Sequence, residues 1–471
     1  MFRTEFTSKM ASIRTLMPLA LLGYAFFWAL LLLVCFGKDV SASPFDVSLL
    51  RLMFIVGVFI SYLFIYLKKD FISDDKNDPL SLFSCSFCAL VGVSNVASEY
   101  LLVPLVFQIA FWMLAGGGFG LMSLKWAKIF SIEWRRDVNL YLALSAALAA
   151  VMYLFCSNLM TPYNSFALVL MPFASYIAYR YVLDTCVGVK HDEKRVSEDT
   201  QLYLSTGLSL MLLGTVFGSA MYLVSTYTSQ AETFLIALIA MAGALTHVVM
   251  CSITKEIPSL IRCEKLALLF CLIFLVLAII LGGHFGIYCA LILVGVWIFV
   301  EIANYSALVG FASGHAEPFT RVARGEFVIV GGSALGWCAC FIVDNTIGNL
   351  VYLAPFAGLI IIVCFMLLGV FMPLQENTYV DKSSDGDPLE GGYFSRRCQN
   401  IAKKYKLSER ESEILVYLAK GRNAQYISDD LVISIYTVKT HIYHIYQKMG
   451  ISSRQELISM VDDVEVEYTG Q

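Results

Sequence analysis

The chain has 471 residues, of which 58% are apolar and only 15% charged, and its formal net charge is −4. A soluble globular protein cannot carry so large an apolar fraction, because its surface must face water; the composition therefore excludes an ordinary soluble protein and indicates a lipid-embedded one. The 13 cysteines lie mostly within apolar runs, where cysteine behaves as a small apolar residue, so they do not predict a metal or redox centre.

Apolar runs long enough to cross a bilayer recur over the first four fifths of the chain. A spanning helix needs about 20 apolar residues. We predict twelve spans, in two groups of six separated by a longer polar loop at 184–200, and short joins leave eleven or thirteen as alternatives. The first group is at 16–36, 48–67, 79–98, 100–123, 138–156 and 162–183, and the second at 203–226, 231–252, 264–283, 285–308, 326–344 and 349–373.

The lysines and arginines test this count independently. If the N-terminus is cytoplasmic, the inside loops hold nearly all of these basic residues, for example Lys68, Lys128 and Arg136, whereas Lys38 is the clear case outside. Cytoplasmic loops of membrane proteins carry such an excess. We therefore expect a multi-pass protein of a bacterial inner (cytoplasmic) membrane, with the N- and C-termini in the cytoplasm.

Six spans, a cytoplasmic loop and six further spans resemble the major facilitator superfamily, whose halves are related repeats. The resemblance is architectural and covers roughly residues 15–373. The superfamily's loop signature of glycine, acidic and basic residues should follow the second span, but the loop from Lys68 to Asp78 lacks the glycines. The resemblance thus implies a major-facilitator-like fold and leaves active transport in doubt.

Ionisable side chains inside the predicted spans are candidates for function, because charge at membrane depth is costly. Glu301 lies in the apolar run 294–307, Asn304 follows three residues later on the same helical face, and His247 lies in 242–250. We expect these residues to bind an unknown small-molecule ligand, with Glu301 holding the ligand or a proton. The alternative is that Glu301 bonds to neighbouring helices or reaches water at the cytoplasmic side.

The composition changes abruptly after Pro373. We predict a membrane domain at 1–374, a linker at 375–394 and a small helical domain at 395–471. The linker is rich in serine, aspartate and glycine and has too little apolar content to fold, which predicts a flexible tether.

Capping residues divide the last domain into four predicted helices. Ser408 begins the first helix, with Glu411 three residues later as a capping box, and the helix ends near Ala419. Asn423 can cap a short second helix. Ser434 caps a third helix that ends at Met449 before Gly450, and a fourth opens at Ser452 or Ser453.

The third helix has two distinct faces. Its buried stripe is predicted by apolar residues at spacings of four, three and four: Val438, Ile442, Ile445 and Met449. The opposite face carries Lys439, Thr440 and Tyr443, and no acidic residue occurs from Leu431 to Arg454. Such a helix suits the major groove of DNA. The spacing alone fits an ordinary amphipathic helix equally well.

Sequence motifs favour the DNA-binding alternative. Two of them are Leu407-Ser408-x-Arg410-Glu411-x-Glu413-Ile414-Leu415 and Ile433-Ser434-x-x-Thr437-Val438-Lys439-x-His441. They belong to a nearly gap-free stretch of some fifty residues that resembles the LuxR/FixJ-type helix-turn-helix, with departures at Tyr426 and Ser428.

The resemblance implies roles for individual positions. Lys439, Thr440 and Tyr443 would approach bases, and phosphate contacts would come from Asn423, Ser434, Thr437 and Lys448. Glu411, His441 and Arg454 would belong to the framework, and the fourth helix would contact a second copy in a homodimer.

We therefore predict an all-α chain with two parts, a polytopic twelve-helix membrane domain and a four-helix LuxR-type helix-turn-helix domain. The leading hypothesis is a membrane-embedded one-component transcriptional regulator whose partners are double-stranded DNA, the lipid bilayer and a small molecule. A major-facilitator-like transporter with an attached regulatory domain is the alternative, and a helix-turn-helix that binds protein is a third. The sequence contains no recognisable catalytic constellation, so we predict no enzyme, no cofactor and no metal site.

Overall fold

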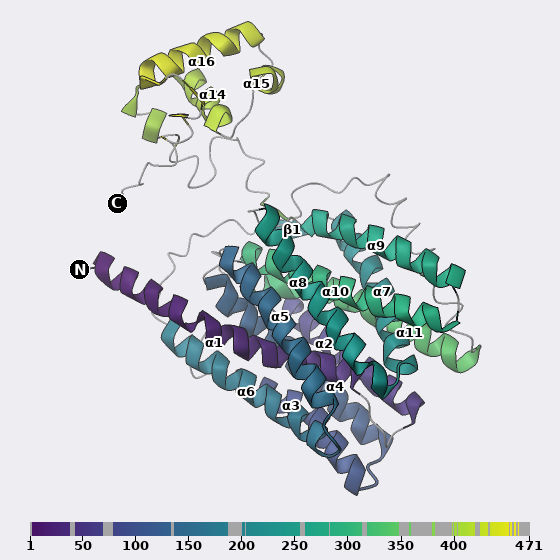
Figure 1. The fold of residues 1–471 in the computed structure, drawn as a ribbon. Coiled ribbons are helices and arrows are strands. Elements are labelled where there is room, and N and C mark those ends of the chain that lie inside the picture. Colours follow the sequence, from purple (N-terminus) through teal and green to yellow (C-terminus); the bar gives the residue numbers. More distant parts are fainter. Residues whose placement is uncertain are drawn as a thin grey trace. The chain divides into compact units, whose positions relative to one another are not determined.

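The structure is a computed structural model of the chain (Figure 1). It describes residues 2–37, 43–68, 79–132, 136–186, 200–202, 204–254, 260–281, 283–312, 318–347, 358, 379–381, 398, 400–402, 404–419, 424–431, 434–451, 453, 454, 456, 457 and 460. The chain divides into two compact units: Met1–Val196 with Leu202–Tyr379, and Ser197–Gln201 with Val380–Gln471.

Long helices build the first unit (Figure 1). The described residues of the first group form α1 (Phe2–Phe36), α2 (Pro44–Leu67), α3 (Leu80–Tyr100), α4 (Leu105–Ile132), α5 (Arg136–Ser157) and α6 (Tyr163–Cys186). The second group has α7 (Leu204–Tyr227), the short η2 (Gln230–Glu232), α8 (Thr233–Thr254), α9 (Leu260–Leu281), α10 (Gly283–Ala312) and α11 (Pro318–Thr346). Two short strands, β1 (Thr200–Leu202) and β2 (Tyr379–Asp381), pair in a two-stranded sheet.

Ten of these helices are long and apolar enough to cross a membrane, and α9 adds a shorter apolar stretch at Leu266–Leu281, over the described residues. Each of the first eleven predicted spans therefore coincides with a helix, which confirms the polytopic, helical class. The twelfth prediction, 349–373, lies outside the described residues except for Gly358. The linker predicted at 375–394 also lies outside them, except for β2, so its flexibility and the domain boundaries stay predictions.

Helix α11 begins earlier than its predicted span, as α1 does, and α4 extends beyond the predicted end of its span. The apolar run predicts a span from residue 326, whereas the helix begins at Pro318. Arg321 and Arg324 lower the hydropathy of the first turns but do not interrupt a helix, and proline is well tolerated at the first helical position. Glu326 consequently lies inside a long helix and not at the edge of a span.

Close contacts between glycines and backbone hold helices together within each group. A Cβ atom added to Gly116 on α4 would lie 2.0 Å from the carbonyl oxygen of Phe54 on α2. One added to Gly336 on α11 would lie 2.0 Å from the carbonyl oxygen of Thr215 on α7. Small residues permit such approaches in membrane helices. Gly116 and Gly336 therefore let α4 pack closely on α2 and α11 pack closely on α7.

The two groups of helices contact one another through α2 with α11 and through α5 with α8. Polar contacts reinforce the first of these pairs. Trp337 Nε1 on α11 donates a hydrogen bond of 3.2 Å to the carbonyl oxygen of Ser48 on α2.

Arg51, a buried residue of α2, donates to the carbonyl oxygens of Val34 and Gly37 at the end of α1, and to that of Ser225 on α7. Arg51 thereby satisfies carbonyl groups that the end of a helix leaves exposed.

The second unit has its own hydrophobic core (Figure 1). Its helices are α14 (Glu409–Ala419), α15 (Ala424–Asp430) and α16 (Ile435–Met449), and both α14 and α15 pack against α16. Arg454, Glu456, Leu457 and Met460 are helical residues of the segment predicted as the fourth helix. A further helical segment, with Cys398, Ile401 and Ala402 buried in the core, precedes α14.

Candidate nucleic-acid interface and membrane-domain site

Local side-chain chemistry sets both ends of α16. Ser434 is the N-cap, and its hydroxyl oxygen accepts a hydrogen bond of 3.0 Å from the Thr437 backbone N–H. At the other end Gly450 has φ 69° and ψ 30°, the left-handed conformation that glycine adopts without steric cost. The predicted bounds of this helix are therefore confirmed. They were predictable because the N-cap Ser434 and the C-cap Gly450 stand directly beside the helix ends that they determine.

The two faces of α16 differ as the spacing predicts. Val438, Ile445 and Met449 are buried in the core of the second unit. Lys439 and Thr440 are exposed on the other face, and Tyr443 is 63% exposed. Tyr436, two turns before Tyr443 on the same side, is 80% exposed. Large exposed tyrosines beside a lysine, with no acidic residue on the helix, form a surface suited to base edges and phosphates.

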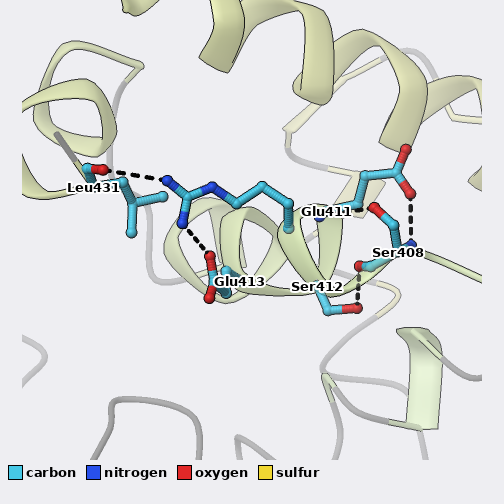
Figure 2. Close-up of polar contacts among 6 residues, drawn as sticks. Ser408, Glu411, Ser412, Glu413 and Leu431 are labelled. Atoms are coloured by element: carbon cyan, nitrogen blue, oxygen red, sulfur yellow. Dashed lines mark hydrogen bonds and ion pairs between the residues drawn. The ribbon is translucent and has the colours of Figure 1, made fainter. Parts of the chain in front are cut away.

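A capping box begins α14 (Figure 2). The backbone N–H of Ser408 donates to Glu411 Oε2 at 2.7 Å, and the Glu411 N–H donates to Ser408 Oγ at 3.3 Å. Ser412 Oγ donates in turn to the Ser408 carbonyl oxygen at 2.8 Å. The predicted capping box is therefore confirmed.

Glu411 also connects α14 to α16. Lys448 Nζ lies 2.6 Å from Glu411 Oε2, and the Glu411 side chain is only 6% exposed. Burial raises the pKa of Glu411, but hydrogen bonds from Lys448 and Ser408 outweigh that effect and hold the pKa below its usual range. Lys448 thus orients α16 against α14, a framework role that the resemblance implied for Glu411 but not for Lys448.

Arg410 makes a second connection, between α14 and the residue that follows α15. Its Nη2 donates 3.2 Å to the carbonyl oxygen of Leu431, and its Nη1 pairs with Glu413 Oε2 at 2.5 Å (Figure 2). Leu431 stands at the start of the turn before α16. Arg410 therefore holds one side of the helix-turn-helix in place.

The predicted phosphate-contacting residues that the structure describes lie at the two ends of α16. Ser434 and Thr437 lie at the N-terminus of α16, where their hydroxyl oxygens are 2.8 Å apart. Lys448 lies at the other end, in the ion pair with Glu411. Asn423 lies outside the described residues.

The helical segment before α14 was not predicted. Cys398, Ile401, Ala402 and Tyr405 contribute to the core of the second unit, and Lys406, with φ 50°, ends the segment in the left-handed region. Their spacings of three, one and three are those of one helical face. That spacing was the available signal, although the segment directly follows the polar linker.

In the membrane domain, Asn304 is fully buried and its Nδ2 donates 3.1 Å to Glu326 Oε1 on α11. Glu301, one turn earlier on α10, lies within hydrogen-bonding reach of the same Glu326 carboxyl group. Glu326 was missed because its span was predicted to begin there. The structure therefore brings Glu301 and Asn304 together around a third polar residue.

His247 occupies a separate position on α8. It is 1% exposed, and its ring lies edge-on to Phe299 of α10, with ring centroids 5.7 Å apart. Among the described residues neither of its ring nitrogens has a hydrogen-bond partner. No recorded contact joins His247 to Glu301 or Asn304 within the described part of the chain.

Known proteins resemble the two units separately. Residues 405–461 match the family described as "Bacterial regulatory proteins, luxR family". The oxygen regulatory protein NreC of Staphylococcus aureus, from strains bovine RF122 / ET3-1 and MRSA252, is 35% identical over 97 residues. That match covers 20% of this chain and 44% of NreC, so the chain spans less than half the length of these relatives.

Among solved structures, the chain is similar to a major facilitator superfamily transporter, FucP, in its outward conformation. The TM-score is 0.47 at 15% sequence identity, over 76% of this chain and 99% of that one. The chain's own structure has ten helices, among the described residues, that are long and apolar enough to cross a membrane. The protein is thus a multi-pass membrane protein whose residues 405–461 form a LuxR-family helix-turn-helix DNA-binding domain.

Proposed function

We propose that the protein is a membrane-embedded one-component transcriptional regulator. Its membrane domain senses a small molecule, and its C-terminal domain binds double-stranded DNA as a homodimer. The observation that carries the proposal is the exposed, acid-free face of α16 within a domain that matches the luxR family. No enzymatic activity is part of the proposal.

The proposed DNA contacts follow from the position of each side chain on α16. Lys439, Thr440 and Tyr443 are exposed on the face away from the core and would reach base edges in the major groove. Ser434 and Thr437 lie at the helix N-terminus, where backbone N–H groups and the helix dipole favour a phosphate. Asn423 and Lys448 complete the proposed set, and Lys448 would reach a phosphate from its ion pair with Glu411.

The proposed location is the inner membrane, with both chain ends in the cytoplasm. The support is the concentration of lysine and arginine in alternate loops of the sequence. This topology leaves the DNA-binding domain in the compartment that contains DNA. The segment after α16, in which Leu457 is buried, would provide the dimer contact.

The test replaces two exposed residues of α16 in the full-length protein. Lys439→Ala with Tyr443→Ala should weaken operator binding by tenfold or more, because a base contact contributes about 1–3 kcal/mol. A gel-shift assay and a reporter gene would measure the effect. Lys404→Ala, which removes an exposed lysine outside α16, serves as the control. Unchanged DNA binding by the double variant would contradict the assignment.

A transporter with an attached regulatory domain is the second candidate. It is favoured by two groups of long apolar helices that meet through α2–α11 and α5–α8. Vesicles containing a chain truncated before Tyr379 would take up substrate in that case. The regulator proposal expects no uptake above that of empty vesicles.

A further inference from the structure

Two acidic side chains meet inside the membrane domain. Glu301 on α10 and Glu326 on α11 lie within hydrogen-bonding reach of one another, and Glu326 is 2% exposed. Two ionised carboxylates repel each other when they lie close together, so a shared proton or a bound cation would stabilise the pair. In the described part of the chain the recorded polar partners of this pair are one another and Asn304, with no lysine or arginine among them.

Asn304 shows that the site lacks a donor. Its Nδ2 donates to Glu326 Oε1 at 3.1 Å, which directs the amide group toward the carboxyl pair. Its Oδ1 has no hydrogen-bond partner among the described residues, although the side chain is fully buried. A buried acceptor without a donor costs free energy. A bound group that donates hydrogen bonds would remove this cost.

Aromatic rings lie beside these acceptors. Tyr305 follows Asn304 on α10, and its hydroxyl donates 2.7 Å to the carbonyl oxygen of Ser123 on α4. The ring of Tyr24 on α1 stacks on that of Tyr305, with centroids 5.7 Å apart. Because α1 and α4 belong to the first group of helices, the site lies where the two groups meet.

We propose that Glu301, Glu326 and Asn304 bind a primary ammonium group. Such a group has one positive charge and three N–H donors, which match the three acceptor side chains. On binding, the ammonium ion takes the place of the shared proton, and that proton leaves to solvent, so the net charge of the site is unchanged. A quaternary ammonium ion lacks the N–H donors, and an alkali cation does not donate hydrogen bonds to the amide oxygen.

That a molecule with a primary ammonium group is the signal sensed by the regulator rests on the proposed function. That such a group binds at this site does not depend on it. The experiment therefore measures binding directly on the purified full-length protein in detergent at neutral pH. The probe is methylammonium chloride, compared with tetramethylammonium chloride and sodium chloride at equal concentration. We expect a saturable rise in Tm with methylammonium alone, and release of protons in weakly buffered solution.

Variants of Glu326 and Asn304 test whether binding occurs at this site. Glu326→Gln and Asn304→Ala should each weaken methylammonium binding by roughly tenfold or more, because each removes a charge-assisted or buried hydrogen bond. Glu99→Gln, which removes a carboxylate elsewhere in the membrane domain, should bind like the wild type. If one variant fails to fold, the comparison of the three salts on the wild-type protein still decides.

Several results would overturn the proposal. Equal Tm shifts with sodium or tetramethylammonium would show a site without the donor requirement. No Tm shift and no proton release with methylammonium would show that the carboxyl pair holds only protons. Wild-type affinity in Glu326→Gln would place binding elsewhere. The Lys439→Ala, Tyr443→Ala variant should bind methylammonium normally, which separates failure of DNA binding from failure of this site.

Discussion

At the scale of single residues, Glu411 makes the stability of the DNA-binding domain depend on pH. Its pKa in the folded state lies below its usual range. A lowered folded-state pKa contributes stability above the unfolded-state pKa of about 4.3, and that stability is lost as the pH falls through the folded-state pKa. Acidification should therefore destabilise this domain.

Glu411→Gln tests this expectation. At neutral pH the variant should lose about 1 kcal/mol, since the partner Lys448 is 41% exposed and solvent screens the pair. Its Tm should also fall less steeply than that of the wild type between pH ~5 and pH ~3. Thermal unfolding followed by circular dichroism measures both. Glu409→Gln, an exposed residue two positions earlier, should keep the wild-type pH dependence; a parallel change in both variants would contradict the role of the ion pair.

Glu411 also shows which contacts of a single residue can be predicted from the sequence. The partnership of Glu411 with Ser408 is predictable, because a capping box involves residues three positions apart. Its partner Lys448 is 37 positions away, so their contact depends on how α14 packs on α16. Glu326 escaped prediction because its predicted span begins at that residue, and its partner Asn304 lies on another helix.

At the scale of helices, glycine determines how closely α2 and α4 approach. Gly116→Ala would place a methyl group 2.0 Å from the Phe54 carbonyl oxygen, so the helices must separate. We expect a loss of about 1–3 kcal/mol, typical of overpacking. Gly117→Ala is a matched control, because its nearest such atom is the Gly57 carbonyl oxygen at 4.0 Å. Thermal unfolding in detergent should lower Tm for the first variant only, and equal losses would contradict this account.

Helix boundaries were predictable where chemistry is local. Ser434 and Gly450 define α16 from within one turn of its ends. The start of α11 was predicted late, because hydropathy reports the apolar length and not the helical length. The arrangement of the helices in the first unit was beyond a sequence reading, since helices that are apolar on every side carry little information about which face contacts which neighbour.

At the scale of the whole molecule, the two units have separate hydrophobic cores, which share no residue in the described part of the chain. We expect calorimetry of the full-length protein in detergent to show two unfolding transitions. Ile414→Ala removes a fully buried side chain from the smaller core and should cost that unit about 2–5 kcal/mol. Only one transition should move. A single transition, or a shift of both, would show that the units unfold together.

The separate cores also bear on how such a protein can be built and altered. Because the capping box, the Glu411–Lys448 pair and the buried face of α16 all lie within one unit, a homologous domain could replace that unit with its internal contacts intact. Under the proposed function, recombination at the junction would produce regulators with the same input and a new set of target genes. The junction, and not either core, is where new circuits can arise by genetic exchange.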